Sequence, residues 1–197
     1  MNDRLGSAAR PLILASQSPR RREILEKLGV TFTVCPAKSE VAIDPNLPLC
    51  DAVTAVARAK AEEIAAANPG CAVLGADTVV AIGETVLGKP KDEDDAKRML
   101  RALSGNEHRV VTAVWLVEES GEGRGFASDN RVTFATLSDE EIDAYVATGE
   151  PMDKAGAYGI QGFGGRYITR LCGDFYAVMG LPCGELWQFL KKSCENS

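Results

Sequence analysis

The sequence is short of histidine, of aromatic residues and of positive charge. It holds one histidine, His108, and aromatic residues make up 6% of the chain. Lysine and arginine number 22 against 28 aspartate and glutamate residues, so the formal net charge is −6. A protein that coats nucleic acid needs a broad positive surface, and this charge balance argues against one. A small anion held by a local cluster of cations remains open.

A single histidine also limits the catalytic chemistry. A Ser-His-Asp triad would have to use His108, which adjoins a strand-like apolar run, and the sequence contains no GxSxG segment. We therefore interpret His108 as a structural residue and do not expect serine-hydrolase chemistry.

The cysteines point to a reducing compartment. Six of them stand at positions 35, 50, 71, 172, 183 and 194, with no CxxC or CxH spacing, which argues against a zinc site or a redox motif. The first apolar run is five residues long, too short for a signal sequence or a membrane span. We expect a cytoplasmic protein with neither a membrane nor a nucleic acid as partner.

The length and pattern of the chain predict one domain of the α/β class. With 197 residues, 45% of them hydrophobic, the chain can build one full core. Strand-like and helix-like segments alternate, which predicts a mixed twisted sheet with flanking helices and two lobes around a cleft. We expect residues 1–10 to be a flexible leader and residues 11–197 to form a single domain.

Local signals mark several element boundaries. Ser18 and Pro19 are typical of a helix start. Ser138 and Glu141 form a capping box for a short helix. The run CAVLGADTVVAI predicts a buried strand that is broken at 75–77 and followed by a hairpin turn at 83–84.

The segment Ser16-Gln17-Ser18-Pro19-Arg20-Arg21-Arg22 lies between a predicted strand and a predicted helix. A helix N-terminus presents free N–H groups and suits a phosphate, while serine hydroxyls and arginine guanidinium groups add donors. The alternative is a surface helix with a basic first turn. Cations at a helix N-terminus oppose the helix dipole, however, so their presence favours a bound anion.

Asp77 is the second candidate, because it interrupts an apolar run near a predicted strand end. It could hold a divalent cation or deprotonate a water, or it could simply cap a turn. Lys60, on an alanine-rich helix, and Lys89, before a proline, are weaker candidates: taken alone, they are better explained by a solvated helix face and by a simple loop.

Residues 156–165 carry a dense set of glycines, GAYGIQGFGG, that matches neither a GxGxxG loop nor a Walker loop. Such density indicates that the backbone approaches something closely, either a ligand or another chain segment. Within it, the amide of Gln161 offers a donor and an acceptor, which complement the N3–H and carbonyl edge of uracil or thymine.

Taken together, the segments LILASQSPRRREILEKLG, AVARAKAEEIA, LGADTVV, GETVLGKPKDEDDAKRMLRALSG and EPMDKAGAYGIQGFGG resemble the Maf septum-formation family of nucleotide pyrophosphatases. The resemblance runs from about residue 11 to residue 190. It implies a fold similar to that of the inosine-triphosphate pyrophosphatases, often as a homodimer. It also implies cleavage of a nucleoside triphosphate into the monophosphate and pyrophosphate, with Mg²⁺, or Mn²⁺ or Co²⁺ in its place.

The same resemblance assigns roles to individual residues. Asp77 would be the proton acceptor or a metal ligand. The phosphate-binding residues would be Ser16, Arg20, Arg21, Lys60 and Lys89.

Three positions resemble the branch of the family that hydrolyses dTTP and UTP: Arg20, Thr78 and Gln161. The alternatives are the branch that prefers 7-methyl-GTP and a nucleotide-binding regulator of cell division with little turnover. One position departs from the family. An acidic pair is usual where this chain reads Glu40-Val41, so Glu40 is the nearest candidate for a second metal ligand.

Overall fold

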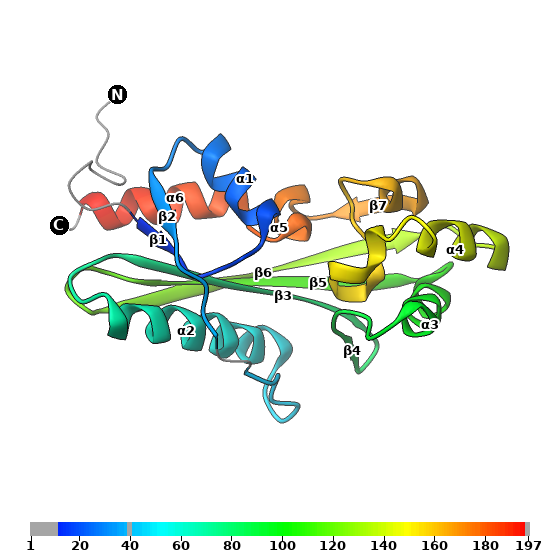
Figure 1. Ribbon diagram of the computed structural model, residues 1–197, viewed down its shortest axis with the longest axis horizontal. Coiled ribbons are helices and arrows are strands. Elements are labelled where there is room, and N and C mark those ends of the chain that lie inside the picture. The colour runs from blue at the N-terminus through cyan, green and yellow to red at the C-terminus, as the bar shows by residue number, and fades with distance from the viewer. Residues whose placement is uncertain (1–11, 39–40, 196–197) are drawn as a thin grey trace. The chain divides into compact units, whose positions relative to one another are not determined.

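The computed structural model of the chain, shown in Figure 1, describes residues 12–38 and 41–195. Residues 1–10, predicted to be a leader, and Glu40 lie outside the described residues. The structure divides into two compact units. The first unit comprises the chain up to Asp77, Thr112–Ser128 and the chain from Gly180 onward, and the second comprises Thr78–Val111 and Asp129–Met179.

A seven-stranded mixed sheet has the strand order β2-β1-β3-β5-β6-β7, with β4 paired to β3. Its strands are β1 (Leu12–Leu14), β2 (Phe32–Val34), β3 (Val73–Ile82), β4 (Thr85–Leu87), β5 (Glu107–Val117), β6 (Gly123–Phe134) and β7 (Ile168–Cys172). β1 pairs in parallel with β2 and β3, whereas the β3–β4 and β6–β7 pairs are antiparallel. The chain passes from one unit to the other within β3, β5 and β6.

In the first unit, helices cover the sheet on both faces. Figure 1 shows α2 (Leu49–Ala67) on one face, and α1 (Pro19–Lys27) and α6 (Cys183–Glu195) on the other. Ser18 caps α1 and Pro19 occupies its first turn, as the sequence predicted. The buried apolar side chains between β1, β3, β5 and α2 include Ile13, Ala15, Ala61, Ile64, Val73 and Val117.

The contact between α2 and β3 is unusually close because β3 carries a glycine there. A Cβ placed on Gly75 would lie 2.3 Å from the carbonyl oxygen of Ala57 and 2.9 Å from the Cβ of Ala61. Both alanines are fully buried. Small residues on the helix and on the strand therefore set the distance between the two elements.

The second unit has its own core. Helices α3 (Glu93–Leu103) and α4 (Asp139–Val146) contact each other, and short 3-10 segments η1 (Glu150–Asp153), η2 (Ala155–Ala157) and η3 (Phe163–Tyr167) follow, before α5 (Phe175–Met179). The capping box of α4 at Ser138 and Glu141 is present, which confirms that prediction. The core includes Leu100, Leu103, Phe134, Ile142, Tyr145 and Tyr158.

The predicted break in the strand at 75–77 is wrong. β3 is continuous from Val73 to Ile82, pairing with β1 at one end and with β4 at the other. Gly75 serves close packing against α2 instead of ending the strand. The predicted hairpin is confirmed, since Ile82 pairs with Thr85 across a turn in which Gly83 has a φ of 54°.

His108 lies in the core of the second unit, in agreement with its structural interpretation. Its side chain is 2% exposed, its Nε2 lies 2.8 Å from the hydroxyl of Tyr158, and it makes edge contacts with the rings of Phe134 and Tyr158. Burial lowers the pKa of His108 from 6.5 to about 4. The folded protein therefore holds this side chain neutral.

In the part of the chain that the structure describes, no helix combines the length and the apolar character that crossing a bilayer requires.

Replacing Gly75 by alanine should destabilise the protein, because the new methyl group would meet the backbone of α2. Overpacking of this kind costs about 1–3 kcal/mol, and it should lower Tm by roughly 3–10 °C. Gly184→Ala, in α6 where a Cβ meets no atom within 4 Å, is the matched control. It should leave Tm unchanged or raise it slightly. Equal Tm values for both variants would contradict the packing argument.

The stability of the protein should decrease as the pH is lowered, and His108 should account for part of this decrease. Between pH 6.5 and about 4 the unfolded chain binds a proton at this residue that the folded chain does not, so the folded state loses free energy as the pH drops. From pH 7 to pH 5 the loss amounts to about 2 kcal/mol. Urea unfolding of His108→Gln, which keeps a hydrogen-bonding side chain without a titrating group, should show a pH dependence smaller by about that amount. Identical slopes for the variant and the parent protein would rule out this contribution.

Candidate functional site

The turn between β1 and α1 in the first unit presents a serine hydroxyl to an arginine. The Oγ of Ser16, which is 8% exposed, accepts hydrogen bonds from the backbone N–H of Ser18 at 3.3 Å and from Nη1 of Arg21 at 3.0 Å. Ser18 caps the helix by accepting from the backbone N–H of Arg21 at 3.5 Å. The strand end, the turn and the first helical turn are thus joined in one hydrogen-bonded polar cluster.

Arg21 is held at two ends. Its Nε donates to the backbone carbonyl of Gly180 at 2.9 Å, and its Nη1 reaches Ser16. Burial lowers the pKa of the Arg21 guanidinium, the negative charge of Asp77 opposes that change, and the positive charge of Arg20 adds to it. The guanidinium still carries its charge at neutral pH. Its plane is therefore fixed before any ligand binds.

Asp77 lies on β3 in the first unit and forms an ion pair with Lys60 of α2. The Nζ of Lys60 donates to Oδ1 of Asp77 at 2.6 Å, and the side chains are 25% and 17% exposed. Gly75 and Asp77 are two residues apart on the strand and so share one face. The close packing of α2 at Gly75 brings Lys60 within reach of the carboxylate.

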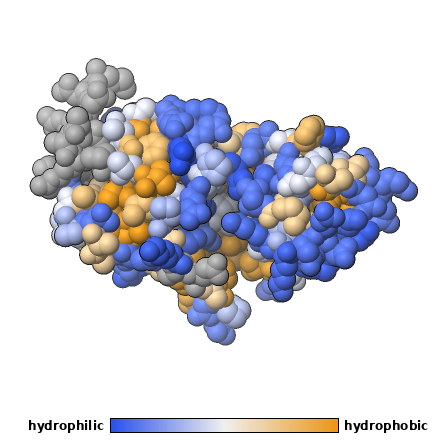
Figure 2. Space-filling view, viewed as in Figure 1, coloured by the Kyte–Doolittle hydropathy of each residue, from blue (hydrophilic) through white to orange (hydrophobic). Residues whose placement is uncertain are grey.

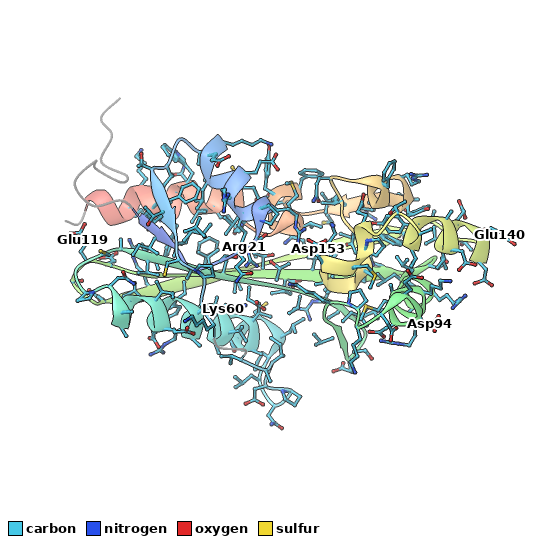
Figure 3. The ribbon with its side chains drawn as sticks, viewed as in Figure 1. Arg21, Lys60, Asp94, Glu119, Glu140 and Asp153 are labelled. Atoms are coloured by element: carbon cyan, nitrogen blue, oxygen red, sulfur yellow. The ribbon has the colours of Figure 1, made fainter. Side chains whose placement is uncertain are left out.

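The first unit therefore assembles five of the predicted site residues. Figure 3 labels Arg21 on α1 and Lys60 on α2, the helices on the two faces of this unit's sheet. Ser16 follows β1, which pairs with β3 at Leu74, just before Asp77. The group contains three cations, Arg20, Arg21 and Lys60, and one carboxylate, that of Asp77. Its local charge is positive in a protein whose net charge is −6.

The other three residues assigned to the substrate belong to the second unit. Thr78 is half-buried on β3, whereas Lys89, after β4, and Gln161, in the glycine-rich segment, are exposed. The backbone N–H of Gly156 donates to the carbonyl of Gly88 at 3.0 Å, which ties the start of the glycine-rich segment to the segment that carries Lys89. At Gly156, where φ is 69°, a Cβ would meet Val80 of β3 at 2.8 Å.

The glycine-rich segment closely approaches another part of the chain, which is one of the two possibilities that the sequence left open. A Cβ on Gly162 would lie 2.4 Å from the carboxylate of Glu150, and one on Gly164 would lie 2.5 Å from the hydroxyl of Tyr145. Sequence reasoning missed Glu150 and Tyr145, although an acidic residue shortly before a glycine-dense segment was a usable signal. It also missed the carbonyl of Gly180, which no side-chain pattern marks.

The candidate site suits a metal ion that is coordinated largely by substrate and water, and not one that is coordinated by protein side chains alone. No group of three or more histidine, cysteine, aspartate or glutamate side chains that could hold a metal occurs among residues 12–38 and 41–195. Asp77 alone fits a cation such as Mg²⁺, which commonly binds to one or two carboxylates together with phosphate oxygens and waters. Glu40, the other predicted ligand, lies outside the described residues.

Solved structures resemble the chain in fold. The structure of a HAM1 protein from Coxiella burnetii matches with a TM-score of 0.53 at 16% identity, covering 95% of this chain and 100% of that chain. At this identity the likeness concerns the fold alone. With the seven-stranded mixed sheet and its flanking helices, it confirms the predicted α/β class.

Similar sequences carry more detail. The dTTP/UTP pyrophosphatase of Anaeromyxobacter dehalogenans (strain 2CP-1 / ATCC BAA-258) is 49% identical over 186 residues, covering 92% of this chain and 93% of that protein. The dTTP/UTP pyrophosphatase of Aquifex aeolicus (strain VF5) is 46% identical over 183 residues, covering 92% and 94%. The family model described as Maf-like protein matches residues 11–193. The chain therefore belongs to the Maf-like protein family.

Proposed function

We propose that the chain hydrolyses dTTP and UTP, and modified pyrimidine nucleotides of the same form, to the monophosphate and pyrophosphate. The observation that carries the proposal is the cluster of the first unit, in which Arg21 and Lys60 are positioned beside Asp77. Cations next to one carboxylate suit a polyanionic substrate that must also meet a base. The names of the relatives, dTTP/UTP pyrophosphatase, support the same activity.

The cations bind the triphosphate and stabilise the charge that develops on pyrophosphate as it leaves. The guanidinium of Arg21 is already oriented by Ser16 and Gly180, so little conformational freedom is lost when it binds phosphate oxygens. The ammonium of Lys60 has three donors, so it can keep its bond to Asp77 and still donate to a phosphate. Arg20 and Lys89 add charge to the same task.

Asp77 acts as the proton acceptor. A water attacks the α-phosphorus, the bond from that phosphorus to the bridging oxygen breaks, and pyrophosphate leaves with the electron pair. The proton of the attacking water passes to the carboxylate of Asp77. The bond to Lys60 holds this carboxylate in one orientation, which fixes where the water must lie.

The proposal includes a divalent cation, Mg²⁺ or alternatively Mn²⁺ or Co²⁺, with Asp77 and Glu40 as the carboxylates that would hold it. Such an ion, when bound, neutralises phosphate charge and lowers the pKa of a coordinated water. Asp77 would then orient the water through the ion as well as accept its proton, and Lys60 would still fix the carboxylate.

Base selection is assigned to Gln161, with Thr78. The amide of Gln161 can donate to a carbonyl of a pyrimidine and accept from its N3–H. Its side chain is exposed and so is open to a ligand. The proposal further includes a cytoplasmic location, with which the free thiols of Cys35, Cys71 and Cys172 agree, and a homodimer without a nucleic-acid partner.

A nucleotide panel with chromatography of the products tests substrate, bond and base together. With Mg²⁺ present, dTTP and UTP should yield dTMP and UMP with pyrophosphate. Their kcat/KM should exceed that of 7-methyl-GTP by at least about 10-fold, which corresponds to roughly 1.4 kcal/mol of discrimination. A preference for 7-methyl-GTP would contradict the proposed substrate and would place the chain in the branch of the family that prefers 7-methyl-GTP. Equal trace turnover of every nucleotide would favour a binding regulator.

Replacing Asp77 by asparagine should abolish most of the turnover while nucleotide binding persists, because the amide cannot accept the proton. The expected loss in kcat is about 10²–10⁴-fold, and the Kd for a non-hydrolysable dTTP analogue should change far less. Glu62→Gln is the matched control, since Glu62 pairs with Arg58 on the exposed face of the same helix as Lys60. It should keep parental kinetics. Turnover at the parental rate in Asp77→Asn would show that Asp77 is not the proton acceptor.

A further inference from the structure

One carboxylate organises the glycine-rich segment of the second unit. Oε2 of Glu150 accepts from the backbone N–H of Phe163 at 2.8 Å, and Oε1 accepts from the N–H of Gly164 at 3.1 Å. Oε1 also accepts from the hydroxyl of Tyr145 at 2.7 Å. The hydroxyl oxygen of Tyr145 in turn accepts from the N–H of Gly159 at 3.2 Å. Both ends of the segment 159–164 are therefore tied to one side-chain pair.

The glycines of this segment leave the room that these bonds need. Besides the approaches of Gly162 to Glu150 and of Gly164 to Tyr145, a Cβ on Gly159 would lie 2.8 Å from Cε of Lys154. Lys154 donates to the backbone carbonyl of Glu150 at 2.6 Å. Side chains at these glycines would collide with Glu150, Tyr145 or Lys154, so the glycine density and Glu150 are parts of one arrangement.

The carboxylate is suited to this task in its ionised form. Burial opposes its ionisation, but the hydrogen bonds from Tyr145, Phe163 and Gly164 and the charge of Lys154 outweigh burial and lower the pKa of Glu150. An ionised carboxylate only accepts hydrogen bonds, and Phe163, Gly164 and Tyr145 each bring it a donor. Burial, followed by the bond to Glu150, raises the pKa of Tyr145, so its hydroxyl stays protonated and able to donate.

Gln161 lies between the two tied ends. Gly159 before it is bonded to Tyr145, and Phe163 after it is bonded to Glu150, while the N–H of Gly162 donates to the carbonyl of Gly159 at 3.2 Å to close a turn. The turn leaves the side chain of Gln161 exposed. The backbone position from which the amide projects is thus set by Tyr145 and Glu150, which lie 13 or 14 positions before the backbone groups that they bind.

We propose that Glu150, assisted by Tyr145, is a positioning residue that holds the turn 159–164 and thereby aims the amide of Gln161 at the base of the nucleotide. The inference rests on the proposed function and deepens it, because it makes base selectivity depend on a residue that touches no substrate. Loss of the carboxylate should loosen the turn and weaken discrimination between bases. The phosphate cluster of the first unit should keep its contacts.

Glu150→Gln tests the proposal, because it preserves size but replaces one acceptor oxygen by an NH₂ group that faces donors. In the substrate-free variant, the amides of Phe163 and Gly164 should exchange hydrogen at least about 10-fold faster, as expected for a lost hydrogen bond. The ratio of kcat/KM for UTP to that for GTP should fall about 10-fold, mainly through KM. Tyr145→Phe, which removes only the bridging hydroxyl, should change both readouts in the same direction by a smaller factor. Glu140→Gln, on the exposed face of α4, is the matched control and should change neither.

The outcomes separate this inference from the proposed function. Faster exchange with an unchanged base ratio would overturn the inference, and so would a uniform loss of activity on every base. If the parent protein prefers a purine, the proposed substrate is wrong, and the ratio of that purine to UTP then serves as the selectivity readout. Should Glu150→Gln fail to fold, Tyr145→Phe carries both measurements, and parental values in that variant would overturn the inference.

Discussion

The ion pair between Lys60 and Asp77 is the contact on which the proposed chemistry of the first unit depends, and it exists because Gly75 lets a helix approach a strand. The two side chains come from elements that would stand farther apart if the strand carried any side chain at that position. With Ala57 and Ala61 of α2 packed against Gly75 of β3, the Nζ of Lys60 lies 2.6 Å from the carboxylate. A packing constraint among the smallest residues of the chain thereby positions the carboxylate that we propose as the proton acceptor.

Charge in this protein is organised locally. The net charge is −6, yet the carboxylate of Asp77 on β3 pairs with Lys60 and acts on Arg21, which in turn lies close enough to Arg20 to be affected by its charge. Figure 2 shows how much of the visible surface is hydrophilic, as expected when a quarter of the residues are charged. Ion pairs on exposed helix faces, such as that of Arg58 with Glu62, contribute little to stability. The half-buried cations near Asp77 are different, because in the proposed function a bound polyanion would offset the cost of their desolvation.

The sequence predicted those parts of the fold that depend on neighbours in the chain. Ser18 caps α1 and Ser138 with Glu141 caps α4, because capping uses residues three positions apart and can be seen in the sequence. Prediction from the sequence failed where the role of a residue depends on contacts with residues distant in the chain. Gly75 looked like a strand break because glycine usually weakens a strand, but its function is set by Ala57 and Ala61. Individual site residues such as Arg21 and Asp77 could be named from type and spacing, whereas the carbonyl of Gly180 that holds Arg21 could not.

The glycine-rich segment is a second case in which the sequence indicates a close contact but does not identify the partner. Its glycine content indicates that a ligand or another chain segment lies close to the backbone, but only the three-dimensional structure identifies Glu150 as a partner. A carboxylate is well suited to this position because its two oxygens can satisfy several N–H groups of a tightly turned backbone at once, and a neutral amide of the same shape could satisfy fewer. The turn is therefore rigid without being packed by side chains of its own. The one polar side chain left in residues 159–165 is that of Gln161, so the rigidity of the turn serves a single amide.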